Sequence, residues 1–209
     1  MPTDLETLII DEGKKLSLHQ RMKMAKDAAL GMNWLHSSNP IFIHRDLKLS
    51  NLLVDNNYKV CVCDFGLTQM KPRDVNNLEY DPHGSPLYMA PEVFVGDYNE
   101  KCDIYSFGIV LWEILTQTQA FEQISDNLPA FISAVCDKGF RPEIPKDCPV
   151  RLRKLIEDCW QKDASKRPPF SDIIVTLDNI CIDAAIHDLA ARKFWRETYL
   201  GKVVTFYFH

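Results

Sequence analysis

Several features that would assign the chain to a special class are missing from its 209 residues. The N-terminal residues include neither a basic stretch nor an apolar core, so we do not expect a secretory signal. No apolar run is long enough to cross a membrane, because the most apolar stretch, residues 104–115, is interrupted by Glu113. Basic residues are not in excess: the net charge is -5, with 24 Lys and Arg against 29 Asp and Glu. This balance argues against a nucleic-acid partner and against binding to an anionic membrane.

The cysteines also lack a pattern that would indicate a disulfide framework. There are seven of them, an odd number, and no two form a C-x-x-C pair. Without a signal peptide they indicate reduced thiols and a cytoplasmic location. Cys61 and Cys63 with His44 offer ligands for zinc, but the alternation of side chains along a strand explains the two cysteines better.

What the sequence does contain is typical of one globular domain, with 46% hydrophobic and 25% charged residues. Apolar residues recur every three or four positions from Ser17 to Leu35, and Ser17 with Gln20 forms a capping-box pattern, which predicts a helix. Residues 103–116 are apolar on every side, which predicts a buried helix. The remaining predictions are helices at 151–160 and 172–189, strands at 41–43, 52–54 and 59–63, a loop at 64–91 and an unfinished β-like element at 203–208. The fold class is therefore mainly α, a helical bundle with small β elements.

Three short motifs follow one another along the chain. They are His44-Arg45-Asp46-Leu47-Lys48-Leu49-Ser50-Asn51, Asp64-Phe65-Gly66 and Ala90-Pro91-Glu92. Each is weak evidence alone, since an isolated Asp or Asn in a turn is usually a cap or a solvated group. Together they resemble the catalytic loop, the metal-binding turn and the end of the activation segment of a protein kinase. The resemblance implies the fold of a kinase C-terminal lobe, arranged around the catalytic loop.

The resemblance gives a chemical role to four of these residues. Asp46 would accept or orient the proton of the substrate hydroxyl, and Lys48 would place a cation beside the transferring phosphoryl group. Asn51, the third member of the catalytic set, and Asp64 offer the oxygen ligands that Mg²⁺ prefers. The implied cofactors are ATP and Mg²⁺. Lys48, Asn51 and Asp64 would contact them, and Asn51 and Asp64 would bind the metal.

Other matches to the family are structural. Asp103 resembles the aspartate that hydrogen-bonds the backbone of the catalytic loop. Glu92 and Arg167 resemble the ion pair that ties the end of the activation segment to a distal loop, and breaking such a pair in a buried place costs about 3–5 kcal/mol. Ser85 stands where the family usually has threonine, and its hydroxyl could bridge the catalytic aspartate and lysine.

A regulatory role is implied for three residues, Arg45, Tyr80 and Ser85. Arg45 precedes the catalytic aspartate, as in kinases whose activation segment is ordered by a phosphate group. Tyr80 is the only hydroxyl-bearing residue between Gln69 and Gly84, so our hypothesis is that phospho-Tyr80 is that group. Two alternatives stay open: a neighbouring acidic residue supplies the negative charge permanently, or Tyr80 is a packing residue.

The chain is most similar to the tyrosine-kinase-like group, and within it to amoebal kinases that carry a C-terminal Src-homology-2 domain. The run at residues 24–36 (MAKDAALGMNWLH) and the stretch at 182–195 carry this similarity. Asp4-Leu5-Glu6 resembles the start of the helix that follows the hinge, and the sequence has neither a glycine-rich loop nor a Val-Ala-Ile-Lys strand. We therefore expect residues 1–180 to form a C-terminal lobe without its N-terminal lobe, followed by a linker and truncated tail at 181–209.

Two functions from different classes follow. The first is a protein kinase that phosphorylates serine and threonine in signal transduction, with dual specificity left open and little activity expected without the N-terminal lobe. The second is a non-catalytic kinase lobe that acts as a binding or competitor protein. Retention of Asp46, Lys48, Asn51 and Asp64 favours the first, because a binding protein has no chemical need of that set. The expected partners are protein substrates, and a small lobe or an adaptor on the apolar surface that the missing lobe would leave exposed.

Overall fold

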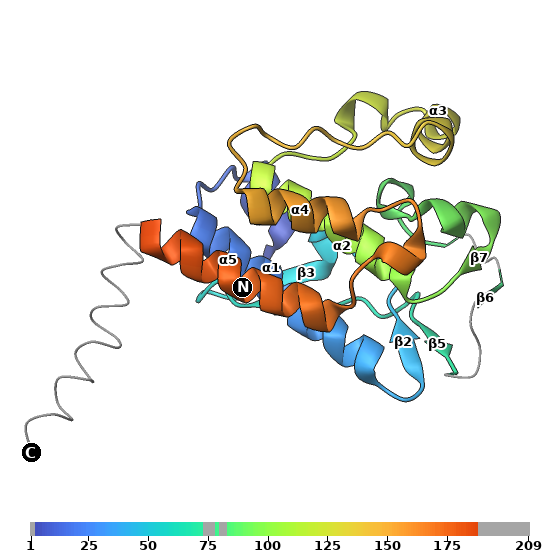
Figure 1. The fold of residues 1–209 in the computed structure, drawn as a ribbon, viewed down its shortest axis with the longest axis horizontal. Coiled ribbons are helices and arrows are strands. Elements are labelled where there is room, and N and C mark those ends of the chain that lie inside the picture. The colour runs from blue at the N-terminus through green and yellow to red at the C-terminus, as the bar shows by residue number, and fades with distance from the viewer. Residues whose placement is uncertain (1–2, 73–77, 80–82, 188–209) are drawn as a thin grey trace, which may run out of the picture.

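The computed structural model describes residues 3–72, 78–79 and 83–187, and within them the fold is mainly helical, as predicted. Tyr80 and the β-like run at 203–208 lie outside the described residues. Four long helices lie side by side and form the body of the molecule (Figure 1). They are α1 (Leu18–Ser37), α2 (Lys101–Thr116), α4 (Val150–Cys159) and α5 (Phe170–His187).

Helix α1 begins where the capping-box pattern predicts. The side chain of Ser17 accepts a hydrogen bond from the amide of Gln20, and the side chain of Gln20 accepts one from the amide of Ser17. Two amides that the first helical turn leaves without a partner are thereby satisfied. The apolar face of the helix, including Met22, Ala25 and Met32, is buried against α5 and α2.

Helix α2 is the buried centre of the bundle. It packs on α1 and α4, and its residues from Cys102 to Leu111 are all buried. The prediction of a helix that is buried on every side is confirmed. Two acidic residues, Asp103 and Glu113, lie inside this helix with almost no exposure.

The described residues form three small antiparallel sheets. The first has the order β1 (Thr3–Asp4), β3 (Leu52–Val54) and β4 (Val60–Val62), the second pairs β2 (Ile41–Ile43) with β5 (Gln69–Lys71), and the third pairs β6 (Leu78–Glu79) with β7 (Asp97–Tyr98). The strands at 41–43 and 52–54 have the predicted bounds, and β4 lies within the predicted 59–63. The interpretation of residues 64–91 as loop is wrong at β5 and β6. Each of these strands pairs with a segment distant in sequence, which local composition does not reveal.

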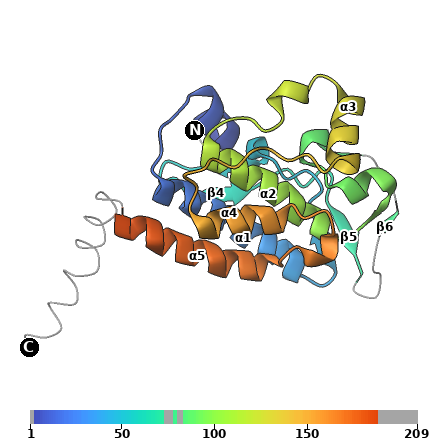
Figure 2. The ribbon, with the colours of Figure 1, turned by 45° about the horizontal axis from the view of Figure 1, so that its top comes forward.

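Short helical turns complete the chain. They are the π-helical η1 (Thr7–Asp11) and η6 (Ser133–Asp137), the short α3 (Leu128–Ile132), and the 3₁₀ turns η2 (Leu49–Asn51), η3 (Pro86–Tyr88), η4 (Pro91–Val95), η5 (Glu122–Ile124) and η7 (Ala164–Lys166). The helix α3 lies apart from the four long helices (Figure 2) and packs on η5 and η6. None of the described helices combines the length and the apolar character that a membrane-spanning segment requires.

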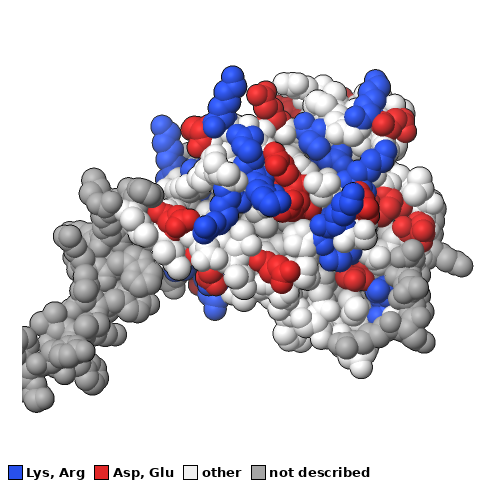
Figure 3. All heavy atoms as spheres, in the orientation of Figure 1, with Lys and Arg blue, Asp and Glu red and all other residues white. Residues whose placement is uncertain are grey.

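Basic and acidic side chains are mixed on the face formed by α4 and α5 (Figure 3). Several of them pair with each other, such as Lys154 with Asp158 and Arg151 with Asp183. This face therefore presents no continuous field of one sign.

Candidate active site

The catalytic-loop motif follows β2, and a buried carboxylate fixes its backbone. Asp103 accepts hydrogen bonds from the amides of His44 and Arg45, at 2.8 and 2.9 Å, and its Oδ2 lies 2.8 Å from Nε2 of His36. Burial alone would raise the pKa of Asp103, but the hydrogen bond and charge of His36, the charge of His44 and the amide of Arg45 outweigh it and lower the pKa. Arg45 has a φ of 71°, a left-handed conformation that costs a non-glycine residue energy and needs such support.

The carboxylate of Asp46 lies at the centre of the site and is held by three residues. Its Oδ1 accepts the amide of Ser85 at 2.9 Å. Its Oδ2 accepts the side-chain nitrogen of Asn51 at 2.9 Å and lies 3.1 Å from Nζ of Lys48. The side chain is 8% exposed, so the carboxylate is ordered and retains a narrow opening to solvent.

Lys48 and Ser85 are linked directly. The ammonium of Lys48 donates to the hydroxyl of Ser85 at 2.8 Å. The predicted bridge between aspartate and lysine is therefore made by two groups of Ser85, its amide toward Asp46 and its hydroxyl toward Lys48. This arrangement orients a cation and a carboxylate toward one point, as transfer of a charged group requires.

Asn51 and Asp64 lie on adjoining segments. The amide of Cys63 donates to the carbonyl of Asn51 at 3.0 Å, which joins the end of β4 to the catalytic loop. Asp64 follows with a φ of 60°, is exposed, and accepts the amide of Gly66 at 3.3 Å.

The donor set of these two residues fits Mg²⁺. Asn51 makes both of its side-chain contacts through nitrogen, so its side-chain oxygen accepts no hydrogen bond from any residue that the structure describes. Two protein oxygens suit a hard cation that takes its other ligands from water and phosphate. No group of three or more His, Cys, Asp or Glu side chains within the described ranges could hold a metal ion by itself.

Leu53 is a candidate site residue that the motifs do not include. It lies on β3 between buried Leu52 and Val54, yet it is 37% exposed and faces Cys61 across the strand pair. Its exposed apolar side chain lies on the middle strand of the first sheet, two positions after Asn51. The signal in the sequence was the run Leu52-Leu53-Val54, in which strand alternation must turn one apolar residue outward.

Arg45 contacts the start of the activation segment. Its guanidinium donates to Oε1 of Gln69 at 3.1 Å and lies over the ring of Tyr98, 5.9 Å from the centroid. The hydroxyl of Tyr98 donates to the same Gln69 oxygen at 2.8 Å. Arg45 therefore connects the catalytic loop to β5 and β7.

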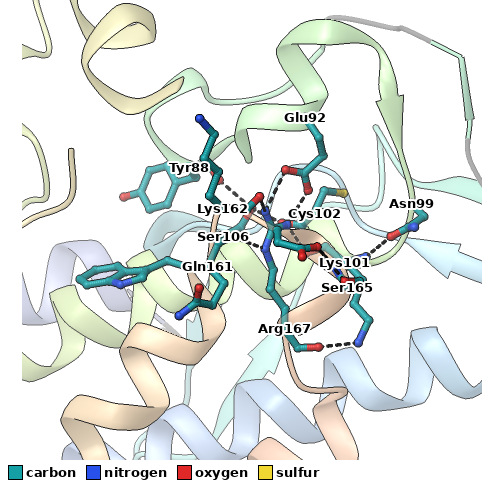
Figure 4. Close-up of polar contacts among 12 residues, drawn as sticks. Tyr88, Glu92, Asn99, Lys101, Cys102, Ser106, Gln161, Lys162, Ser165 and Arg167 are labelled. Carbon is teal, nitrogen blue, oxygen red and sulfur yellow. Dashed lines mark hydrogen bonds and ion pairs between the residues drawn. The ribbon is translucent and has the colours of Figure 1, made fainter. Parts of the chain in front are cut away.

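Glu92 and Arg167 form the predicted pair (Figure 4). The two groups make two contacts, of which Nη2 to Oε2 is 2.8 Å. Arg167 is 1% exposed and also donates to the carbonyls of Gln161 and Lys101, both at 2.9 Å. Its guanidinium lies 5.3 Å from the ring centroid of Tyr105. Every face of this buried cation therefore has a partner.

A second buried network was not predicted. The hydroxyl of Tyr88 donates to Glu113, 2.9 Å from Oε2, and the amide of Ala120 donates to Oε1 at 2.9 Å. The hydroxyl of Ser106 donates to the carbonyl of Tyr88 at 2.8 Å. In the sequence Glu113 is only an interruption of an apolar run, so nothing there pointed to its partners.

Comparison with known proteins agrees with these motifs. The family described as "Protein tyrosine and serine/threonine kinase" matches residues 2–177. The chain is 53% identical over 199 residues to dual specificity protein kinase shkC of Dictyostelium discoideum, covering 94% of the chain and 39% of shkC. It is 51% identical over 199 residues to shkA, a dual specificity protein kinase of the same organism, covering 94% of the chain and 38% of shkA. It is 41% identical over 177 residues to the Arabidopsis thaliana protein named probable serine/threonine-protein kinase SIS8, covering 84% of the chain and 17% of SIS8. The chain thus spans about two fifths of the length of shkC and shkA.

Proposed function

The chain belongs to the protein tyrosine and serine/threonine kinase family, and from this premise we propose that it carries the catalytic and substrate-binding half of an active kinase domain. The activity would be phosphoryl transfer from ATP to protein hydroxyl groups. The observation that carries the proposal is the convergence of Lys48, Asn51 and Ser85 on the carboxylate of Asp46.

Asp46 would receive the substrate hydroxyl. The amide of Ser85 occupies one lone pair of Oδ1, and Asn51 and Lys48 both contact Oδ2. The carboxylate is therefore fixed in direction, and Oδ1 retains acceptor capacity for a hydroxyl proton. A hydroxyl held by this carboxylate would have its oxygen directed at the phosphoryl group, and this positioning supplies much of the catalysis.

Lys48 would stabilise the charge that develops during transfer. Its ammonium is held by Asp46 and Ser85, so it needs little reorganisation when the reaction occurs. Ser85 would act through its two contacts, keeping the cation and the carboxylate on the same side of the reacting group.

Asn51 and Asp64 would hold Mg²⁺, and Leu53 would contact the base of ATP. Bound Mg²⁺ would neutralise phosphate charge, which would favour departure of the nucleoside diphosphate. The sequence has no glycine-rich loop and no Val-Ala-Ile-Lys strand to grip the phosphates. We propose that these 209 residues correspond to a C-terminal lobe, with residues 1–180 in the kinase domain and 181–209 as linker, and that an N-terminal lobe supplies the phosphate grip.

The substrates would be serine and threonine hydroxyls, with tyrosine as a further acceptor. The names of shkC and shkA support dual specificity, and that of SIS8 supports serine and threonine. The resemblance to tyrosine-kinase-like enzymes with a Src-homology-2 domain and the cytoplasmic location are part of this proposal. So is the ordering of the activation segment by phospho-Tyr80 near Arg45, which phosphopeptide mapping of active protein would reject if Tyr80 were never modified.

The test joins the chain to the N-terminal lobe of the shkC kinase domain and measures phosphate transfer from Mg-ATP to peptides containing serine, threonine or tyrosine. We expect transfer to serine and threonine, and weaker transfer to tyrosine. Asp46→Asn should lower kcat by about 10²–10⁴-fold, the usual contribution of a positioned acid or base. Asp158→Asn, in an exposed ion pair on α4, is the matched control and should retain activity.

A non-catalytic binding role is the second candidate. It would replace the kinase proposal if the joined protein folds, as judged by circular dichroism, and transfers no phosphate while the intact shkC domain does. A protein of that kind would compete for kinase substrates without modifying them.

A further inference from the structure

Helix α5 presents an apolar face to solvent, on the outside of the helical bundle (Figures 1 and 2). Its inner side packs on α1 and α4. On its outer side, the aliphatic side chains of Val175, Ile182 and Ile186 are 61%, 52% and 53% exposed. On the neighbouring α4, every exposed side chain after the first residue is charged. Single exposed apolar residues are common, but a row of them on one helix marks a surface that binds another molecule.

The three side chains have the spacing of a coiled-coil seam. Ile182 follows Val175 by seven residues and precedes Ile186 by four, so at 100° per residue the three lie within about 40° around the helix axis. Asn179 lies on the same line, four residues after Val175 and three before Ile182. Steps of three and four residues place side chains where two helices pack side by side. We call these four residues the α5 seam.

The acidic residues beside the α5 seam are paired within the chain. Asp178 forms an ion pair with Lys26 of α1. Asp183 forms one with Arg151 of α4, at 3.2 Å. Because these carboxylates have cations beside them, two α5 seams can approach each other without strong like-charge repulsion. The seam itself contains no charged side chain, so it suits an uncharged, apolar surface better than a nucleic acid or an anionic membrane.

Asn179 indicates which partner fits. Its side-chain nitrogen donates to the carbonyl of Val175 at 3.0 Å, and its side-chain oxygen accepts no hydrogen bond from the part of the chain that the structure describes. An amide has both donors and an acceptor, so two Asn179 side chains that face each other across a two-fold axis can bond to each other. A single Asn in an apolar seam fixes the register of two parallel helices. A second copy of the same helix therefore satisfies this residue.

We propose that the α5 seam pairs with the α5 seam of a second copy of this chain, in parallel and in register. Each seam residue then faces its own counterpart, which is the contact that a two-fold symmetric dimer requires. A contact confined to one helix per copy is smaller than the about 1,200 Å² that stable complexes bury, so the dimer is weak and depends on concentration. The pairing does not depend on the proposed kinase function, and Asp46, Lys48, Asn51 and Asp64 all lie outside α5.

Sedimentation equilibrium of the 209-residue chain tests the pairing. We expect the average mass to rise from 24.1 kDa toward twice that value as the protein concentration increases. Val175→Glu and Ile182→Glu each place a carboxylate without a cation in the apolar contact, and each should keep the chain monomeric over the same range. Both residues are exposed, so the fold should not change, which circular dichroism checks. A wild type that stays monomeric at every concentration overturns the proposal.

Val95→Glu and Met70→Glu are the matched controls. Val95 on η4 is 79% exposed and Met70 on β5 is 61% exposed, and neither belongs to the α5 seam. The same new charge at these positions should leave the dimer as it is in the wild type. The proposal is overturned if either control is monomeric as well, or if the two seam variants still dimerise, because the contact then lies elsewhere.

Mixing variants of opposite charge tests the register. Ile182→Glu and Ile182→Lys should each be monomeric alone, because like charges meet at one point of the contact. Mixed together they should form a heterodimer, in which the carboxylate of one copy meets the ammonium of the other. Val175→Glu mixed with Val175→Lys should behave in the same way. In an antiparallel pair only one of these positions can face its own counterpart, so recovery at one position alone, or at neither, overturns the parallel pairing.

Discussion

The charge of Arg167 is buried almost completely. The site depends on the hydrogen-bond and ion-pair partners that such single residues find. Its guanidinium uses all of its donors on Glu92 and on backbone carbonyls of two other segments. A side chain with so many fixed partners holds the end of the activation segment against the loop before α5. Its replacement should therefore cost far more than the loss of an ordinary ion pair.

Removal of Arg167 is the first test of this view. Arg167→Ala leaves the carboxylate of Glu92 without its cation, and we expect the free energy of unfolding to fall by about 3–5 kcal/mol. Urea denaturation measures it. Lys154→Ala, which breaks the exposed pair with Asp158, should change stability by less than about 0.5 kcal/mol. Equal losses in the two variants would show that burial of the pair is not what matters.

Residue-level prediction from sequence succeeded where a motif names a residue and failed where burial alone creates the interaction. The contact of Asp103 with the loop backbone and that of Glu92 with Arg167 were anticipated from the family resemblance. Glu113 and Tyr88 were not paired, because their proximity depends on how η3 packs on α2. Spacing along the chain contains no information on that packing.

At the scale of elements, the contact of α2 with α4 depends on a glycine. A Cβ placed on Gly108 would lie 2.9 Å from Cβ of Cys159 and 3.3 Å from the backbone nitrogen of Trp160. These atoms belong to or adjoin the α4 backbone and cannot rotate away. Close approach of the two helices therefore requires hydrogen at this position.

Two glycine substitutions compare this contact with a softer one. Gly108→Ala should lower the free energy of unfolding by about 1–3 kcal/mol, the usual cost of overpacking a core. Gly31→Ala on α1 would meet the terminal carbon Cγ2 of Val62 at 2.8 Å, which a side-chain adjustment can relieve. The gain in helix propensity, about 1 kcal/mol, should then leave Gly31→Ala close to neutral. Thermal unfolding of both variants measures the two effects. If Gly108→Ala were neutral, the contact of α2 with α4 would not require glycine at this position.

The long helices were easier to predict than the strands β5 and β6, for a physical reason. Apolar periodicity and the Ser17 capping box define α1 locally, and the uninterrupted apolar character defines α2. The strands β5 and β6 are short and are stabilised by partners distant in sequence, so their own residues carry little signal. The helix α3 is only five residues long, so its own residues carry little signal as well.

The stability of the whole molecule should depend on pH through Glu113. Its pKa is raised from 4.5 to about 7 in the folded chain, so between these values the folded state holds a proton that the unfolded state has lost. The free energy of unfolding must then fall as pH increases from 4.5 to 7, and stay level above 7. The shift corresponds to about 3 kcal/mol for this group.

Chemical denaturation at a series of pH values measures this effect. The difference in stability between the wild type and Glu113→Gln isolates the contribution of this group from those of other titrating residues. That difference should change between pH 5 and pH 7 and be constant above. Glu122→Gln, an exposed acid outside the network, provides the reference. Parallel curves for the wild type and Glu113→Gln would show that Glu113 titrates normally.

Helix α2 carries Asp103, Ser106 and Glu113 along its length, and through them it holds both the backbone at His44 and the turn that ends at Tyr88. One inserted or deleted residue between Asp103 and Glu113 would rotate the two ends of the helix against each other by about 100°. Only one of the two loops could then keep its support. In the descent of this family, changes of length should therefore have accumulated in the connections before and after α2, and been eliminated within it.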